Sequence, residues 1–161
     1  MHHAIDVPVE SLPAIDEHAV VVRAPAEATW DAIVATIPRS VGGRLAERYA
    51  RAVGCEHTQS EGDPARIGST LPGFIVARSI RPAMLTLLGE HRFSHYALVF
   101  KVDRLDEERS LLRAETRADF PGWSGRAYKA LVIGTRGHVV AVTRILRAIR
   151  RRAERDATEM G

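Results

Sequence analysis

One stretch in the second half of the chain alternates in polarity and decides the fold: Leu111-Leu112-Arg113-Ala114-Glu115-Thr116-Arg117-Ala118-Asp119-Phe120. From Leu112 onward its even-numbered positions are apolar or carry the small hydroxyl of Thr116, and its odd-numbered positions are charged. A period of two residues is typical of a strand that buries one face. The stretch therefore predicts an antiparallel sheet with one face toward a core and the other toward water.

The same alternation precedes this strand, and a turn joins the two. Residues 96–102 place Tyr96 and Leu98 on the more apolar side of a strand, and Asp106-Glu107-Glu108 supplies a charged hairpin turn. Shorter candidate strands lie upstream at residues 67–71, 74–80 and 84–88. We expect these strands to pair in succession through short connections.

Two short helices are expected near the beginning of the chain. Residues 19–23 form a β-branched run of strand length, and Pro25 suits the first turn of a helix. Trp30, Ile33, Val34 and Ile37 then repeat at the spacing of one helical face, which we expect Pro38 to end. The apolar residues of 45–53 repeat the helical spacing and are closed by Gly54.

The chain ends in a strongly amphipathic helix. Pro121-Gly122 breaks the sheet, Tyr128 lies in a first helical segment, and Gly134 to Gly137 permits a kink or a break. From His138 onward one face carries an apolar stripe made of Val142, Ile145, Leu146, Ile149 and Ala153. Such a stripe must be buried against another element, and the sheet is the available partner.

Length and composition fit one globular domain. The chain has 161 residues, of which 45% are hydrophobic and 27% charged, and this composition excludes wholesale disorder and collagen-like repeats. We expect an N-terminal arm over 1–17, one domain over 18–157 and a tail over 158–161. The single cysteine, Cys55, excludes an internal disulfide and is expected to be a small, partly buried apolar residue.

No targeting feature is recognisable in the sequence. No apolar run is long enough to span a membrane, and the N-terminus lacks the basic and apolar regions of a signal peptide. We therefore expect a cytoplasmic location without integral membrane association. A homodimer is possible on this evidence, because the sequence does not fix the oligomeric state.

The net charge of +3 is unevenly distributed. Six arginines between Arg144 and Arg155 face a single acid, Glu154. Such a cluster can meet phosphates of nucleic acid or lipid, or it can be the solvated face of a helix. We favour the solvated face and expect no nucleic acid partner, because no aromatic residue is interleaved among the arginines.

The order of these elements resembles that of the START-like superfamily, also called Bet v 1-like or SRPBCC. The stretch from Val20 to Ile33, with Ala24-Pro25-Ala26-Glu27 and Trp30 one turn later, looks like the first strand and helix of that superfamily. Residues 96–120, then Gly122 and the long helix, look like its last hairpin and closing helix. The resemblance extends over residues 18–155 and suggests a bacterial, polyketide cyclase-like member.

The resemblance implies an α+β helix-grip fold. In this fold a curved antiparallel sheet of six to seven strands wraps around the C-terminal helix, two short helices follow the first strand, and a cavity lies between sheet and helix. Members of the superfamily bind lipids, sterols, polyketides or hormones, and others cyclise aromatic polyketides. No catalytic residue is universal among them, so the resemblance assigns none here.

Several residues are candidates for a ligand site in such a cavity. His138 lies on the apolar face of the last helix. Three interpretations are open for it: a ligand-binding residue, an acid or base, and a histidine of the core. Tyr96, Tyr128 and Thr116 would each direct a hydroxyl into the cavity. Leu98 and Val142 would contribute apolar wall, and Arg78 and Glu90 would pair inside the cavity or anchor a polar head group. Each of these residues also has a plain structural interpretation in the core or on the surface.

We expect no metal and no cofactor. His91 and His95 are four residues apart, a spacing that suits a metal on a helix but separates the side chains by about 13 Å on a strand. The phosphate-binding loop, the dinucleotide-binding glycine pattern and the nucleophile elbow are all missing from the sequence.

Three functions remain open at this point. The first is binding of a small hydrophobic ligand, such as a lipid or polyketide, in the cavity. The second is an enzyme of the polyketide cyclase or dehydratase type that uses acid and base residues of the same cavity. The third is an interaction protein that uses the arginine-rich end of the last helix.

Overall fold

A computed structural model describes residues 8–134 and 136–161 of the chain. A short 3-10 helix, η1 (Val9–Ser11), leads into β1 (Ala14–Val22), which is followed by the helices α1 (Ala26–Val41) and α2 (Arg44–Val53). Five strands come next: β2 (Thr70–Leu71), β3 (Phe74–Ile80), β4 (Met84–His91), β5 (Ser94–Arg104) and β6 (Ser110–Asp119). The helices α3 (Gly122–Val132) and α4 (Gly137–Met160) close the chain.

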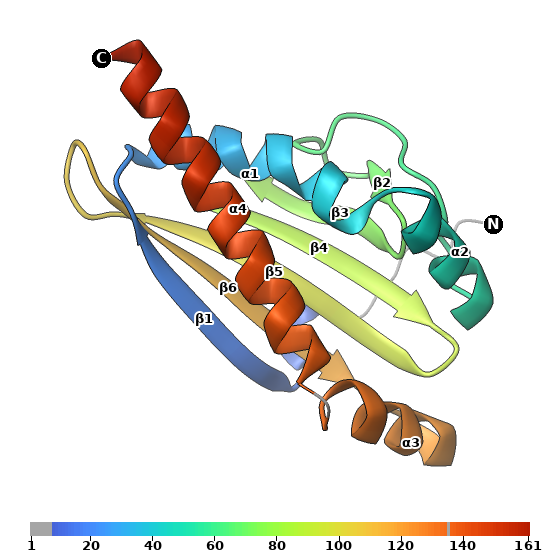
Figure 1. Ribbon diagram of the computed structural model, residues 1–161. Helices are drawn as coiled ribbons and strands as arrows, with labels where there is room; N and C mark the ends of the chain where they lie inside the picture. Colours follow the sequence, from blue (N-terminus) through green and yellow to red (C-terminus); the bar gives the residue numbers. More distant parts are fainter. Residues whose placement is uncertain (1–7, 135) are drawn as a thin grey trace.

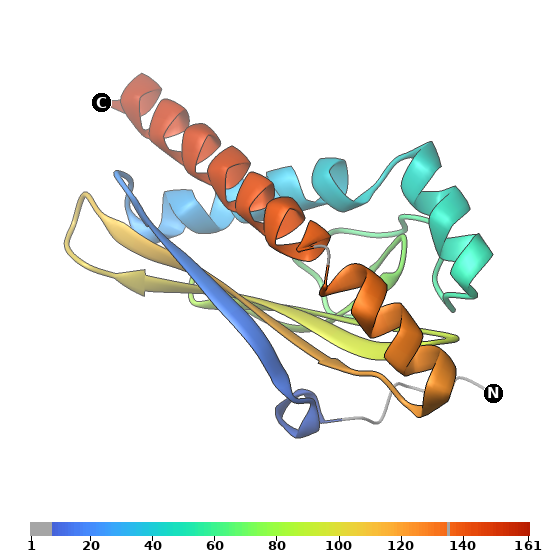
Figure 2. The same cartoon turned by 60° about the horizontal axis from the view of Figure 1, so that its bottom comes forward.

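The strands form one curved, fully antiparallel sheet. Their spatial order is β1-β6-β5-β4-β3-β2, so the first strand closes the edge beside the last one. The helices α1 and α4 lie together across one face of this sheet (Figures 1 and 2). The α+β helix-grip architecture expected from the sequence is thereby confirmed, with six strands and with two helices after the first strand.

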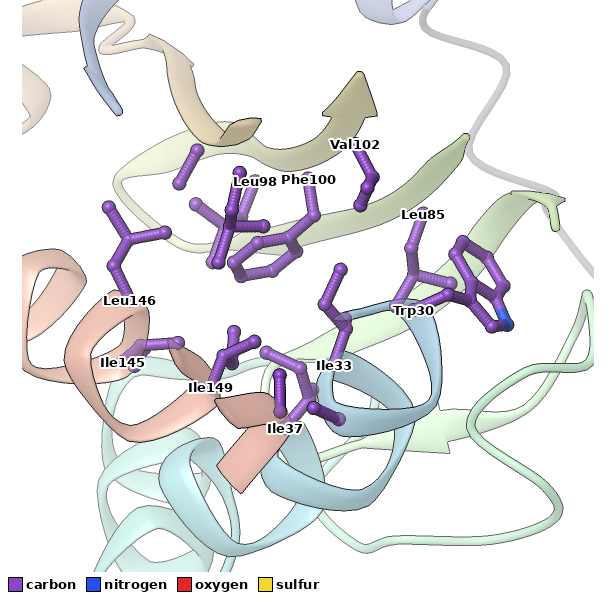
Figure 3. Close-up of a cluster of buried hydrophobic side chains, with 14 of the residues drawn as sticks. Trp30, Ile33, Ile37, Leu85, Leu98, Phe100, Val102, Ile145, Leu146 and Ile149 are labelled. Carbon is purple, nitrogen blue, oxygen red and sulfur yellow. The ribbon is translucent and has the colours of Figure 1, made fainter. Parts of the chain in front are cut away.

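The main core lies between this inner face of the sheet and the helices α1 and α4. The stripe on α4 from Val142 to Ala153 is buried, as its spacing predicted. Phe100 and Leu98 of β5 point toward Ile33 of α1 and Ile149 of α4 (Figure 3). Burying this apolar area is the dominant favourable contribution to folding.

The outer face of the sheet is partly covered by the N-terminal residues. Leu12 is buried there with Leu88 of β4 and Ala97 of β5. The backbone carbonyl of Leu12 accepts a hydrogen bond of 3.0 Å from Arg117 of β6. The residues just before β1 therefore form a small second core on the side away from α4.

Three element boundaries differ from the sequence-based expectation. β1 begins at Ala14 rather than at residue 19, and α4 continues to Met160, so residues expected in the arm and in the tail belong to regular structure. Pro38 lies inside α1, which ends only at Val41. A proline removes a single N–H from the helix, and the burial of Ile37 and the packing of Val41 on the core continue the helix beyond it.

Removing the Phe100 ring from the core should destabilise the protein strongly. We expect Phe100→Ala to lower the free energy of unfolding by about 3 to 5 kcal/mol, because the ring is fully buried and its loss leaves a cavity. Urea unfolding followed by circular dichroism measures the change. Leu45→Ala is the matched control, since Leu45 is exposed on α2. Equal losses in the two variants would contradict the assignment of this core.

Candidate ligand-binding cavity

A cavity of about 450 Å³ lies beyond the end of α4 that begins with Gly137. It is enclosed by the inner face of the sheet, by α2 and α3 and by the first turn of α4. In Figures 1 and 2 the helices α2 and α3 flank the end of the sheet where β4 turns into β5. Where α4 no longer covers the sheet, these two shorter helices complete the wall.

Strand alternation decides which residues of the sheet reach the cavity. Phe74, His91, Tyr96 and Thr116 come from β3, β4, β5 and β6 in turn, and all of them line it. Each lies on the face of its strand that meets α4 farther along. The cavity therefore continues the inner, apolar face of the sheet beyond the hydrophobic core.

Aromatic rings form one wall. The ring centroid of His91 lies 4.9 Å from that of Tyr128 and 5.3 Å from that of Tyr96. Phe74 meets Tyr96 edge-on at 5.3 Å, and Phe93 stacks on Tyr128 at 5.6 Å. Burial, and then the nearby His95, lower the pKa of His91, so its ring is neutral at physiological pH. This wall suits a ligand with flat apolar surfaces.

Tyr96 is fixed in this wall by its hydroxyl. The hydroxyl donates a 2.6 Å hydrogen bond to the backbone carbonyl of Gly73 and lies 3.7 Å from Cys55 Sγ. The ring has room only because position 89 is glycine, since a Cβ built there would lie 2.3 Å from the Tyr96 ring. Burial, together with Cys55, raises the pKa of Tyr96, so the phenol stays protonated.

Cys55 also lines the cavity, as a thiol rather than a thiolate. Burial raises the pKa of the Cys55 thiol, and the hydrogen bond to Tyr96 offsets this only in part. A protonated thiol is a poor nucleophile. The position agrees with the expected small, partly buried apolar residue.

Two tyrosines join α2 to α3. The hydroxyls of Tyr49 on α2 and Tyr128 on α3 are in direct contact, and both side chains line the cavity. Burial first, and then the hydrogen bond to Tyr49, raise the pKa of Tyr128. The contact therefore joins the two helices at the edge of the cavity.

A polar group lies around His138, which also lines the cavity. The Nε2 atom of His138 lies 2.6 Å from Oδ2 of Asp16 on β1, and Nε2 of His18 lies 3.3 Å from the same oxygen. Burial raises the pKa of Asp16, but the hydrogen bonds from His138 and His18, together with the proximity of the Thr116 hydroxyl, lower it by more. Asp16 is therefore a carboxylate at neutral pH, and each histidine that contacts it presents an N–H.

Buried polar atoms in this group lack partners. Among the described residues, Asp16 Oδ1, Thr116 Oγ1 and His138 Nδ1 are buried and make no hydrogen bond. Asp16 and Thr116 are direct neighbours across the β1–β6 pair, yet their side chains do not bond to each other. Buried polar groups in folded proteins are normally satisfied, so this group is suited to an ordered water or a polar ligand atom.

The structure brings together four of the eight residues that the sequence singled out. Tyr96, Thr116, Tyr128 and His138 line the cavity. Leu98 and Val142 lie in the adjacent core, where they support the inner end of the cavity without lining it. Whether the four lining residues bind a ligand stays a prediction.

Arg78 and Glu90 do not belong to this site, contrary to expectation. Arg78 lies on the outer face of the sheet, 3.4 Å from Glu10, and Glu90 is exposed there beside His95 at 3.4 Å. The register of β3 shifts between Val76 and Arg78, and this irregularity turns Arg78 away from the cavity. Successive side chains of β4 point to opposite faces of the sheet. The Glu90 side chain therefore points to the outer face, because its neighbour His91 points into the cavity.

Sequence reasoning missed two contributors to the site. The sequence places Asp16 in the expected N-terminal arm, and it marks His91 only by a spacing to His95 that would suit a metal on a helix. His91 and His95 lie on opposite faces of the hairpin, because His91 lines the cavity and His95 contacts Glu90. Within residues 8–134 and 136–161, no cluster of three or more His, Cys, Asp or Glu side chains could hold a metal ion.

A second hollow of about 500 Å³ lies at the other end of α4. Its lining includes Arg23, Arg109 and the last residues of the chain, Met160 and Gly161. Of the two hollows, only the cavity under α2 and α3 combines an aromatic wall with buried polar atoms lacking partners. We therefore regard that cavity as the candidate site.

Comparison with solved structures places the fold. A scan of protein-family models and a search of curated proteins found no match. The Zhui aromatase/cyclase from Streptomyces sp. R1128 superposes with a TM-score of 0.54 at 19% sequence identity, over 89% of this chain and 94% of that chain. Truncated norcoclaurine synthase from Thalictrum flavum superposes with a TM-score of 0.52 at 15% identity, over 86% of this chain and 94% of that one.

A second structure of norcoclaurine synthase, in complex with dopamine and hydroxybenzaldehyde, gives a TM-score of 0.50 at 16% identity, over 88% of this chain and 87% of that chain. Identities this low establish shared architecture and not shared chemistry. The chain therefore shares the fold of these structures, the helix-grip fold that its sequence resemblance predicted.

Proposed function

We propose that the protein binds a small, largely apolar molecule in the cavity under α2 and α3. The observation that carries this proposal is a cavity of about 450 Å³ that combines an aromatic wall with two buried polar atoms without partners, Thr116 Oγ1 and His138 Nδ1. Small-molecule sites in proteins have this composition, with mostly apolar walls and a few convergent polar groups, and volumes of about 300 to 1,000 Å³.

His138 and Thr116 are the proposed polar anchor. Because the Asp16 carboxylate accepts the Nε2 proton of His138, Nδ1 is the ring nitrogen left to meet a ligand. The Thr116 hydroxyl both donates and accepts. A ligand hydroxyl or carbonyl would satisfy one or both of these atoms, while the rest of the ligand contacts the aromatic wall.

An acid and base enzyme is the second candidate, and the Asp16–His138 pair favours it. A histidine whose far nitrogen is held by a carboxylate is the usual arrangement of a general base, because the carboxylate fixes the tautomer and stabilises the imidazolium. The phenols of Tyr96 and Tyr128 stay protonated and are candidate proton donors in the same cavity. The reaction would be of the polyketide cyclase or dehydratase type, with a proton removed next to a carbonyl group.

The names of two structural neighbours, an aromatase/cyclase and a synthase, agree with either candidate. A carrier needs one polar anchor, whereas an enzyme needs two titratable groups within reach of one reacting atom.

A cytoplasmic location stays a prediction. Within the described residues, none of the helices has both the length and the apolar character needed to cross a bilayer.

Native mass spectrometry of the freshly purified protein tests occupancy of the cavity. We expect a discrete extra mass that is lost on denaturation, since an apolar cavity of this size retains ligands from the expression host. The protein should also bind 1-anilinonaphthalene-8-sulfonate, and an exact apo mass without any binding of this dye would contradict the proposal.

Filling the cavity should abolish dye binding. Ala141→Trp introduces an indole from the first turns of α4 into the cavity, and we expect at least about tenfold weaker binding, equivalent to about 1.4 kcal/mol. Fluorescence titration measures the affinity, and thermal unfolding reports whether the variant is folded. Ala52→Trp, on the exposed face of α2, is the matched control and should bind as the wild type does.

Replacing His138 separates the two candidate functions. His138→Ala should weaken ligand retention by about tenfold, the effect of one lost hydrogen bond of about 1.4 kcal/mol, if the protein is a carrier. The same change should abolish turnover if it is an enzyme. Retention is measured by native mass spectrometry and turnover with polyketide-like substrates. Unchanged behaviour in both assays would remove His138 from the site.

Asp16→Asn should lower stability in a pH-dependent way. Because hydrogen bonds hold the pKa of folded Asp16 below its ordinary value of 3.8, the carboxylate stabilises the fold above that pH, and this contribution is lost as the pH falls through the lower folded value. We expect a loss of about 1 to 3 kcal/mol at neutral pH that disappears in acid.

Urea unfolding across this pH range measures the Asp16 contribution. Asp31→Asn breaks an exposed ion pair with Arg81 and is the control, with an expected change of at most about 1 kcal/mol. An Asp16→Asn loss as small as that of the control would show that the pair with His138 does not stabilise the fold.

A further inference from the structure

The helix α3 is apolar on two opposite faces. Its inward face carries Gly125, which is buried, and Tyr128 and Val132, which line the cavity. Its outward face carries Trp123, which is 84% exposed, and Leu131, which is 65% exposed. An indole this exposed on a helix is unusual, and clusters of exposed apolar side chains mark interaction surfaces.

The charged side chains of residues 121–153, which include all of α3, have one sign. Residues 121–153 contain eight arginines and lysines and no aspartate or glutamate, so the rest of the chain carries 15 cations against 20 acids. On α3 the two cations are Arg126, which lies 4.2 Å over the Trp123 ring, and Lys129. Both side chains are exposed, and the Lys129 ammonium lies 5.9 Å from the ring centroid of Phe120.

The helix α4 also carries exposed cations. Arg144, Arg147 and Arg151 are exposed on the side of α4 opposite the buried stripe. Both ribbon views show α3 at the end of α4 that begins with Gly137 (Figures 1 and 2). A tryptophan among cations, with more cations on the adjoining helix, therefore makes up this part of the surface.

We propose that the outward face of α3 docks on the surface of an anionic phospholipid bilayer. Tryptophan prefers the boundary between lipid head groups and acyl chains, because one part of the indole is apolar and its N–H is polar. Arginine and lysine beside it complement the phosphates of anionic lipids. The association is peripheral, with α3 lying in the interface in the manner of an amphipathic helix.

Two other occupants fit the same observations less well. A symmetric dimer through α3 would bring Arg126 and Lys129 close to their own copies, which costs energy. A nucleic acid would bind the cations but would gain nothing from Leu131, whose side chain offers no stacking surface. Charge and apolar character together favour the bilayer.

Docking would place a wall of the cavity against the membrane. The inward face of the same helix carries Tyr128, whose hydroxyl contacts Tyr49 and joins α3 to α2. If the cavity binds an apolar ligand, which rests on the proposed function, the bilayer is its source or destination. The docking itself does not depend on that function and is tested without any cavity ligand.

Intrinsic fluorescence of the full chain provides the test. The sequence has two tryptophans, and Trp30 is 2% exposed, so a change on binding reports Trp123. We expect vesicles of phosphatidylglycerol and phosphatidylcholine to shift the emission to shorter wavelengths at low salt. Vesicles of phosphatidylcholine alone should bind at least about tenfold more weakly, and high salt should reverse the shift. Absence of a shift with the anionic vesicles would overturn the proposal.

Charge-reversal variants show whether vesicle binding depends on the cations of α3 or only on the net charge of the protein. The double variant Arg126→Glu/Lys129→Glu should lose at least about tenfold in vesicle affinity, measured by co-sedimentation. Arg39→Glu/Arg66→Glu changes the net charge equally at exposed cations outside α3 and α4, and should bind as the wild type does. Trp123→Ala should also weaken co-sedimentation. Equal losses in the two double variants would overturn the proposal.

Two further outcomes would assign the face to another partner. A protein-concentration-dependent shift of Trp123 emission without lipid, together with a doubled mass in light scattering, would assign the face to a second copy of the chain. Single-stranded RNA can also compete with the anionic vesicles for the protein. If RNA releases the protein at a lower concentration than competing vesicles do, the face is assigned to nucleic acid. Either result overturns the bilayer proposal and leaves the cavity measurements unaffected.

Discussion

The burial of the α4 stripe against the inner face of the sheet is the interaction on which the rest of the structure depends. Ile145, Leu146 and Ile149 share one core with Phe100 of β5, and α1 packs beside them. The inner faces of the strands are apolar along most of their length, but α4 covers only part of them. Its first turn begins at Gly137, and beyond it α2 and α3 enclose space that no side chain fills. The cavity is therefore a consequence of a long sheet meeting a helix that stops short.

Regular features of this arrangement were predictable from the sequence, because periodicity directly reflects burial. The alternation from Leu112 to Ala118 and the stripe from Val142 to Ala153 each have one apolar face, and the structure buries those faces. The break between α3 and α4 followed from its glycines. Such patterns place Thr116, Tyr96 and His138 on inner faces even though no motif marks them.

The remaining features depend on single residues that obscure the pattern. Asp16 and His18 point inward from β1, so the beginning of that strand has no apolar alternation and resembles an arm. One irregularity in β3 reverses the direction of Arg78, and no glycine or proline announces it. Pro38 carried a strong local signal for a helix end, but the packing of Ile37 and Val41 on the core was stronger. In each case long-range contacts decided against the local pattern.

The close approach of position 89 to Tyr96 has a consequence for how this cavity can change in evolution. A Cβ at position 89 would lie 2.2 Å from the Gly73 carbonyl oxygen and 2.3 Å from the Tyr96 ring, closer than packed atoms approach. Any side chain there would displace the ring and break its hydrogen bond to Gly73. Positions 89 and 96 should therefore vary together among descendants of this sequence, and a larger residue at 89 requires both the loss of the ring at 96 and a shift of the backbone at Gly73. Positions 89 and 96 together, and neither of them alone, determine the shape of this end of the cavity.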